Sequence, residues 1–84
     1  MKLDDKTKEL IAIGVSVGVH CQPCLEYHVA KAKEAGACDD GIADAIAVAK
    51  MVRKGAMSKM DKFAAAILNS PPADVGSDQD CSAA

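Results

Sequence analysis

The sequence predicts an all-α protein, and three observations support this class. Apolar residues recur at helical spacing along most of the chain, and no window alternates apolar and polar residues as a half-buried strand would. The chain has one Phe, one Tyr and no Trp, so its core must consist of small side chains, which suit closely packed helices. A chain of 84 residues buries only about 60% of its unfolded surface. We therefore expect its helices to continue packing into a second subunit.

The first helix should run from about Asp4 to Val19. Asp4 and Asp5 place negative charge at its positive end. Gly14 and Gly18 lie four residues apart on its apolar side, and small residues at this spacing allow a neighbouring helix to approach closely. We expect a second helix to pack against this side; for Gly18, a weak helix end is an equally good interpretation.

Glu9 has two interpretations on this helix. If the helix continues far enough, Glu9, Ser16 and His20 fall within about 40° of one another and form a polar stripe. Glu9 would then face inward. A glutamate flanked by Lys6 and Lys8 is, however, ordinarily solvated, and the spacing alone leaves both interpretations open.

The second helix should begin near Gln22 or Pro23, because proline is tolerated in the first turn of a helix. It should end at Gly36, since glycine readily adopts the left-handed conformation that closes helices. Before the next helix, Cys38 stands where a capping Ser or Thr would be expected. We interpret Cys38 as an incidental small residue.

A third helix should start at Asp39 or Asp40, and we expect Gly55 to bend or end it. A fourth segment should then run from Met57 to Leu68. The third helix carries one continuous apolar stripe, formed by Ile42, Ala45, Ile46, Ala49, Val52 and Ala56. Residues 1–69 are thus predicted to form one helical domain.

After the helical domain, residues 70–84 read SPPADVGSDQDCSAA, in which too little apolar surface remains to fold. We expect a flexible tail. Cys81 lies within it, and we interpret this residue as an inert exposed thiol.

Composition and hydrophobicity argue against nucleic acid and membranes as partners. The net charge of -2 provides no basic field for nucleic acid, and the aromatic residues that stack on bases are missing. The first ten residues are not those of a secretory signal, and the apolar run from Leu10 to Val19 is too short to span a bilayer. We expect a cytoplasmic protein that binds no membrane.

The segment Cys21-Gln-Pro-Cys24-Leu-Glu-Tyr-His28 carries the candidate chemistry. On a helix, Cys21, Cys24 and His28 lie within about 60° of one another and can share a face. Both sulfurs fall at the helix start, where free N–H groups and the helix dipole stabilise a thiolate. His28 is near enough to exchange a proton with Cys24. Two thiols and a base are the groups needed to reduce a peroxide or a disulfide.

Other interpretations of this segment remain open. A structural zinc site usually has four N or S ligands, so Cys38 or His20 would have to complete the three supplied here. A thioredoxin-like motif would need a preceding strand, and none is predicted. The segment could also be structural, with two buried thiols and a core histidine.

The spacing of these residues also resembles a known family. Glu9, eleven intervening residues and Cys21-x-x-Cys24-x-x-x-His28 are followed by Ala35-Gly36-Ala37 and a helix beginning Asp39-Asp40-Gly-Ile-Ala-Asp-Ala-Ile. This arrangement resembles the alkylhydroperoxidase AhpD core of the carboxymuconolactone decarboxylase family. The resemblance covers roughly residues 5–57, about two-thirds of the chain.

The resemblance implies a helical hairpin that packs against its counterpart in trimers or hexamers. It implies that Cys24 is the peroxidatic thiol and that Cys21 is the resolving thiol, which forms a Cys21–Cys24 disulfide. His28 and Glu9 would be the proton relay that activates Cys24. Lipoylated or thioredoxin-like proteins would be the electron donors. We expect neither a cofactor nor a resident metal.

Two departures from the family pattern stand out. The full-length peroxidase has a histidine between its cysteines, where this chain has Pro23, and it contains two copies of the core, whereas this chain contains one. The lactone decarboxylase branch does not rely on the cysteine pair. We therefore expect peroxide or disulfide reduction rather than decarboxylation.

Overall fold

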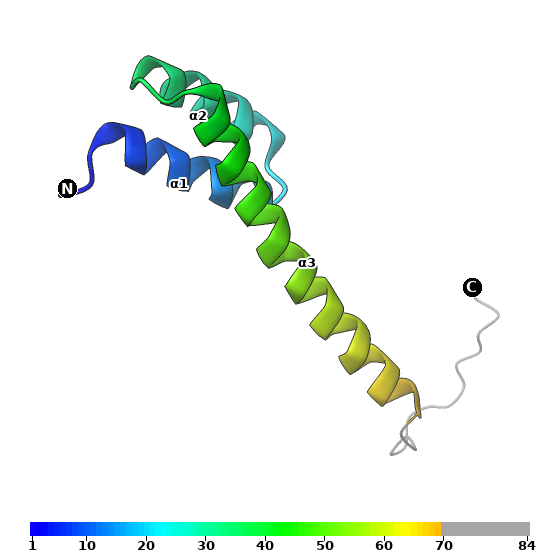
Figure 1. Cartoon of the computed structure of the whole chain (residues 1–84). Coiled ribbons are helices and arrows are strands. Elements are labelled where there is room, and N and C mark those ends of the chain that lie inside the picture. Colours follow the sequence, from blue (N-terminus) through cyan, green and yellow to red (C-terminus); the bar gives the residue numbers. More distant parts are fainter. Residues whose placement is uncertain (70–84) are drawn as a thin grey trace.

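The computed structural model describes residues 1–69, which form three helices and no strand. Helix α1 spans Asp5–Gly18, α2 spans Gln22–Glu34 and α3 spans Asp39–Asn69. The predicted all-α class is confirmed. The predicted tail at residues 70–84, with Cys81, lies outside the described residues. In Figure 1, α1 and α2 lie together at one end of the molecule and α3 extends far beyond them.

Helix α1 begins as predicted and ends slightly early. The Asp4 carboxylate accepts a hydrogen bond from the backbone N–H of Thr7 at 2.8 Å, which caps the helix. The helix stops at Gly18, and His20 adopts a left-handed conformation with φ of 60°. The polar stripe of Glu9, Ser16 and His20 therefore does not form. Ser16 is buried and donates its hydroxyl to a carbonyl within α1 instead.

Helix α2 starts where the sequence predicts and ends two residues before the predicted Gly36. Cys21 is the N-cap residue, and Pro23 lies in the first turn, where its missing N–H has no intrahelical partner to lose. The last helical residue is Glu34, and Gly36 follows with φ of 94°. Gly36 thus provides the left-handed stop that the sequence predicts.

Helix α3 corrects two expectations. Cys38 is not incidental, because its sulfur accepts a hydrogen bond from the Gly41 backbone N–H at 3.4 Å and so caps the helix. Gly55 neither ends the helix nor starts a fourth segment at Met57, since α3 continues to Asn69. A glycine inside a helix costs about 1 kcal/mol relative to alanine, which its good helix-forming neighbours can offset.

The core is small and takes one buried hydrophobic residue from each helix. Ile13 of α1 and Ala32 of α2 are fully buried, and Ile42 of α3 is nearly so. A Cβ placed on Gly14 would lie 3.8 Å from the Ala45 carbonyl oxygen on α3. The close helix approach predicted for the glycine pair is thus present at Gly14. Gly18 has nothing within 4 Å of the same position.

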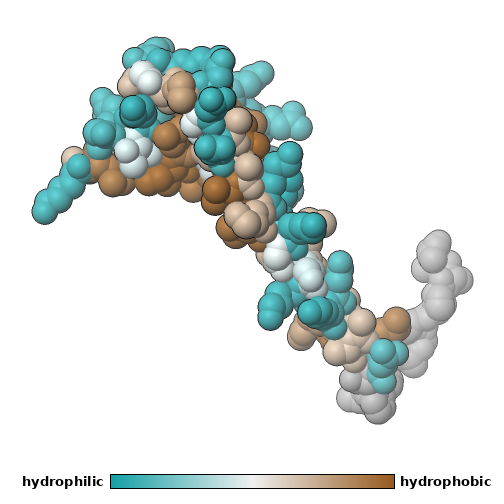
Figure 2. All heavy atoms as spheres, in the orientation of Figure 1, coloured by the Kyte–Doolittle hydropathy of each residue, from teal (hydrophilic) through white to brown (hydrophobic). Residues whose placement is uncertain are grey.

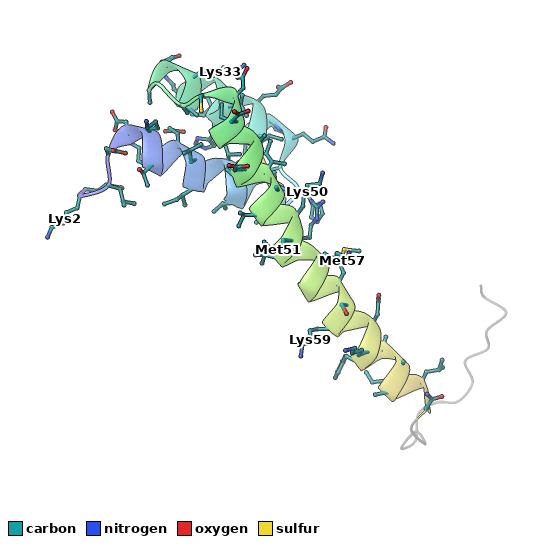
Figure 3. All side chains as sticks on the ribbon, in the orientation of Figure 1. Lys2, Lys33, Lys50, Met51, Met57 and Lys59 are labelled. Carbon is teal, nitrogen blue, oxygen red and sulfur yellow. A yellow bond between two sulfur atoms is a disulfide. The ribbon has the colours of Figure 1, made fainter. Side chains whose placement is uncertain are left out.

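The second half of α3 projects away from the rest of the chain (Figure 1). We call residues 54–69 the arm, and every one of them is exposed. Met60, Phe63 and Ile67 share one face of the arm at helical spacing. In Figure 3, side chains beyond Met57 stand along the arm with no second helix beside them. The arm therefore carries an apolar face that the described chain leaves uncovered.

Hydrophobic surface also gathers near the other helices. In Figure 2 it follows α1 and the adjoining part of α3, whereas hydrophilic surface covers the outer side of α2. No helix within residues 1–69 is both long enough and apolar enough to cross a membrane.

Candidate active site

Cys21 and Cys24 are joined in a disulfide at the start of α2. Their Cα atoms lie 5.2 Å apart, and both residues are half-buried. The backbone N–H of Cys24 donates to the Cys21 sulfur at 3.3 Å. The Cys21 sulfur thus occupies the N-cap position that a serine hydroxyl often takes, where it meets the positive end of the helix. A thiolate formed there on reduction would be stabilised by the same N–H group.

Glu9 and His28 form a hydrogen-bonded pair between α1 and α2. The Nδ1 atom of His28 lies 2.7 Å from the Oε1 atom of Glu9. The Glu9 side chain is only 14% exposed and that of His28 29% exposed, so the inward-facing interpretation of Glu9 is the one the structure supports. Because an ionised carboxylate can only accept, Nδ1 carries the hydrogen and Nε2 is the ring nitrogen left for other chemistry.

The two pairs are connected by the geometry of α2. His28 follows Cys24 by four residues, so both side chains lie on the same face of the helix, one turn apart. The Tyr27 ring packs edge-on against the His28 imidazole with centroids 5.0 Å apart. The arrangement places a disulfide one turn from a carboxylate–imidazole pair, a type of group that can exchange protons.

Glu9 also borders a polar cleft. The cleft has a volume of about 390 Å³ and lies between the start of α1 and the end of α2. Its lining residues are Asp5, Lys8, Glu9, Tyr27, Lys31, Glu34 and Ala35. The cleft therefore connects the Glu9 end of the Glu9–His28 hydrogen bond to solvent.

A second, smaller cleft reaches the disulfide from the opposite end of α1. We call it the Cys21 cleft, and its volume is about 210 Å³. Its lining residues are Ser16, Val17, His20, Cys21, Gln22, Leu25 and Arg53. The first four come from the end of α1 and the turn before α2, so the short turn that ends α1 also shapes the approach to Cys21.

Arg53 comes to this cleft from α3. One of its guanidinium N–H groups donates to the Val17 carbonyl oxygen at 3.2 Å, at the C-terminal end of α1. This position favours a cation, because the last carbonyls of a helix carry partial negative charge. Arg53 is not among the site residues predicted from the sequence. Two features of the sequence could have indicated it. Arg53 is the single arginine of the chain, and it lies on the same helix face as the apolar Ile46 and Ala49.

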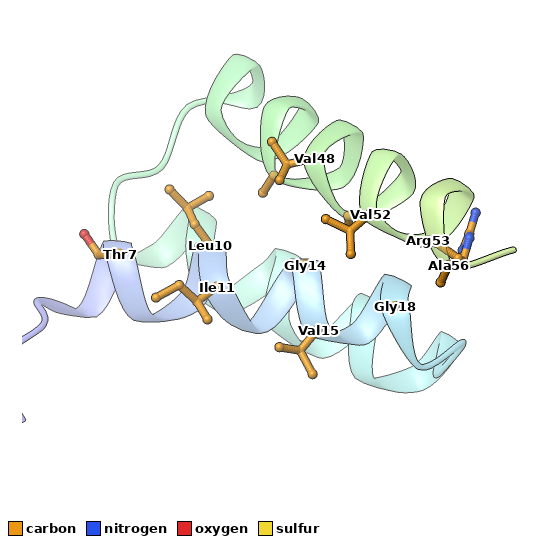
Figure 4. Close-up of a pocket in the computed structure, with 12 residues that line it drawn as sticks. Thr7, Leu10, Ile11, Gly14, Val15, Gly18, Val48, Val52, Arg53 and Ala56 are labelled. Atoms are coloured by element: carbon orange, nitrogen blue, oxygen red, sulfur yellow. The ribbon is translucent and has the colours of Figure 1, made fainter. Parts of the chain in front are cut away.

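An apolar groove runs between α1 and α3 on the other side of Arg53. Its volume is about 620 Å³. In Figure 4, Val48 and Val52 of α3 point toward α1, where Leu10 and Gly14 face them. The groove is lined by Thr7, Leu10, Ile11, Gly14, Val15, Gly18, Ala45, Val48, Ala49, Val52, Arg53 and Ala56. Most of these side chains are aliphatic, so the groove has little to offer a polar ligand.

The structure brings the four predicted site residues together in two pairs, the disulfide and the Glu9–His28 hydrogen bond. Cys38 and His20 were the two candidates for a fourth zinc ligand. In the structure, Cys38 caps α3 and His20 borders the Cys21 cleft. Within the part of the chain that the structure describes, no three His, Cys, Asp or Glu side chains gather as a metal site would require.

Comparison with known proteins gives two similarities. Residues 1–68 match the sequence profile of the carboxymuconolactone decarboxylase family. The chain is also 40% identical over 67 residues to "Uncharacterized protein 4 in cox locus" of Paracoccus denitrificans, a match that covers 80% of this chain and 60% of the relative. The chain thus spans about 60% of that relative's length. No solved structure matches the chain significantly.

Proposed function

The chain belongs to the carboxymuconolactone decarboxylase family, and from this premise we propose that it is a thiol-dependent oxidoreductase of the alkylhydroperoxidase type. The observation that carries the proposal is the Cys21–Cys24 disulfide one helical turn from the Glu9–His28 hydrogen bond. A dithiol beside a base is the arrangement that two-electron reduction of a peroxide or a disulfide requires. The substrate class we propose is an organic hydroperoxide.

The first step takes place at Cys24. In the reduced protein, His28 accepts the Cys24 thiol proton, and the carboxylate of Glu9 stabilises the imidazolium that forms. The Cys24 thiolate attacks the terminal oxygen of the hydroperoxide, and the O–O bond breaks. The alkoxide leaves with the proton from His28 as an alcohol, and Cys24 becomes a sulfenic acid.

The second step closes the disulfide. The Cys21 thiolate attacks the Cys24 sulfur, the S–O bond breaks, and the hydroxyl group leaves as water with a proton supplied through His28. The product is the Cys21–Cys24 disulfide in the described structure. Its regeneration needs two electrons from a thiol donor, for which the family resemblance suggests a lipoylated or thioredoxin-like protein.

We also propose that the working unit is a homo-oligomer, a trimer or a hexamer. Two features support this part of the proposal. The buried core of residues 1–69 is small, and the arm leaves Met60, Phe63 and Ile67 about 60% exposed. Surface of this kind ordinarily marks an interface with another protein.

Thiol trapping after exposure to one equivalent of an organic hydroperoxide tests the proposal. Three proteins are compared by mass spectrometry: the native protein, Cys21→Ser and Cys24→Ser. We expect a rapid Cys21–Cys24 disulfide in the native protein and a trappable sulfenic acid on Cys24 in Cys21→Ser, because the resolving thiol is then missing. Cys24→Ser should react slowly.

The matched control is Cys38→Ser, which removes an exposed free thiol but leaves the disulfide pair intact. It should behave like the native protein. If the native thiols react with the hydroperoxide no faster than free cysteine does, the peroxidase proposal fails, and reduction of a disulfide substrate becomes the reaction to test next.

A further inference from the structure

One of the two disulfide cysteines, Cys21, lines the Cys21 cleft, together with the end of α1 and Arg53 of α3. Cys24 lies one turn from His28 along α2. The two cysteines therefore differ in their surroundings. Cys21 lines the cleft, and Cys24 lies on the same face of α2 as His28.

The charged side chain that lines the cleft is positive. Arg53 brings a permanent positive charge to it, and none of its lining residues is acidic. No carboxylate within residues 1–69 forms an ion pair with Arg53, whose one hydrogen bond goes to the Val17 carbonyl oxygen. A guanidinium has five N–H donors, so others remain for a ligand. The bond to Val17 holds the group in place, which lowers the entropic cost of binding.

We propose that the Cys21 cleft is the docking site of the electron donor and that Arg53 selects a donor thiol carrying a carboxylate. This inference rests on the proposed thiol chemistry and adds to it the binding site and the charge of the reductant. A carboxylate suits the site, because the planar guanidinium can bind it through two N–H groups.

The volume of the cleft indicates how much of the donor can enter it. A volume of about 210 Å³ corresponds to about seven water molecules at ~30 Å³ each. The thiol end of a donor, with a carboxylate a few bonds from the sulfur, has about this number of heavy atoms.

The reduction proceeds in two balanced steps. The donor thiolate attacks the Cys21 sulfur, the Cys21–Cys24 bond breaks, and Cys24 leaves as a thiolate that takes a proton from His28. A second donor thiolate then attacks the donor sulfur of the mixed disulfide. Cys21 leaves as a thiolate at the N-cap, where the Cys24 backbone N–H already points at it. Two donor thiols become one donor disulfide, and two electrons pass to the protein.

A series of three small thiols tests the charge preference on the native oxidised protein. The probes are 3-mercaptopropionate, 2-mercaptoethanol and cysteamine, which are anionic, neutral and cationic beside the thiol. Each reduction rate is divided by the rate at which the same thiol reduces bis(2-hydroxyethyl) disulfide, which corrects for intrinsic reactivity. We expect the normalised rates to fall in that order by about two- to fivefold per step, the size of one partly exposed ion pair. The preference should shrink as salt is added.

Variants assign the effect to Arg53. Arg53→Gln should abolish the preference and Arg53→Lys should keep most of it, while the matched control Lys54→Gln, which removes an exposed charge one residue away, should leave it unchanged. Acid-quenched samples should carry the donor on Cys21. Equal normalised rates for the three thiols, a donor found on Cys24, or an unchanged preference in Arg53→Gln would each overturn the inference.

The outcome is separable from that of the proposed function. Normal oxidation of the protein by hydroperoxide with no thiol preference would leave the peroxidase chemistry standing and remove the donor site. A clear anion preference in a protein that hydroperoxide does not oxidise would leave the donor site standing and redirect the search for the oxidant.

Discussion

Glu9 and His28 lie nineteen residues apart in the sequence and share one short hydrogen bond. If the pair relays protons to Cys24, the charge of Glu9 matters more than its shape. Glu9→Gln keeps the size of the side chain and removes the charge. We expect the rate of hydroperoxide-driven oxidation of Cys24 to fall about 100-fold, the lower range for general acid–base catalysis.

The control for this variant is Glu26→Gln, an exposed glutamate on α2. It should oxidise at the native rate. Stopped-flow oxidation rates give the comparison, and far-UV circular dichroism checks that both variants keep their helices. A native rate in a well-folded Glu9→Gln variant would remove Glu9 from the relay.

Asp4 offers a pH-dependent prediction at the start of α1. The hydrogen bond from the Thr7 backbone N–H holds the pKa of the Asp4 carboxyl below its usual value of 3.8. A lowered pKa in the folded state means that the ionised carboxylate stabilises the fold. This stabilisation is fully present above the unfolded pKa and disappears as the pH falls through the folded pKa.

Asp4→Asn tests this linkage, because asparagine also caps helices but does not titrate. Thermal unfolding of the two proteins between about pH 5 and pH 2 gives the difference in melting temperature. We expect the native protein to be the more stable at the upper end and the difference to close toward the lower end. A difference that is constant with pH would mean that the Asp4 charge does not contribute.

Sequence patterns located some of these residues and not others, for physical reasons. Spacing alone could not decide whether Glu9 is buried, because a glutamate between lysines is equally at home in solvent; the family resemblance favoured the inward position. Cys38 was misjudged since sulfur is a weak acceptor, yet it caps α3. Arg53 was missed because its contact with Val17 depends on how α3 crosses α1, which no local pattern encodes.

At the scale of the helices, local rules predicted most boundaries. Asp4, Pro23 and Gly36 act through their own backbone or their nearest neighbours, so their effects can be read from the sequence. Gly55 was misjudged because its cost is small compared with the cooperative extension of a long helix. The length of α3 is therefore a property of the whole segment rather than of one residue.

Two glycine-to-alanine substitutions should change stability in opposite directions. A Cβ at Gly55 would meet nothing within 4 Å, so Gly55→Ala should stabilise the protein by about 0.5–1 kcal/mol through helix propensity. Gly36 has φ of 94°, where an L side chain is strained, so Gly36→Ala should destabilise it by about 1 kcal/mol or more. Urea unfolding followed by circular dichroism measures both. Equal signs for the two changes would contradict the helix boundaries described above.

At the scale of the whole molecule, the exposed apolar surface is large and the buried core is small. The arm is about 24 Å long at 1.5 Å per residue, and its apolar face has no partner within residues 1–69. An oligomer would cover this face and the groove between α1 and α3. The sequence predicted that a partner is needed from composition, whereas the place of the uncovered surface became visible only with the arrangement of α3.

Phe63→Asp tests the proposed assembly. Phe63 is 62% exposed and lies on the apolar face of the arm, so a buried aspartate there would cost several kcal/mol per interface. We expect the native protein to sediment well above its monomer mass of 8.7 kDa and Phe63→Asp to sediment near it. Ser58→Asp adds the same charge to the polar face of the arm and should assemble normally. A native protein that sediments as a monomer at all concentrations would exclude the oligomer.

The isolation of the arm has a consequence for hydrogen exchange. Amide hydrogens in a solvated helix exchange through local fraying, which needs little free energy, whereas those around Ile13 exchange only when the core opens. Strong protection of residues 54–69 would therefore have to come from another molecule. Exchange in the arm reports on assembly and exchange near Ile13 on the fold, so one experiment over a range of concentrations measures both within the same chain.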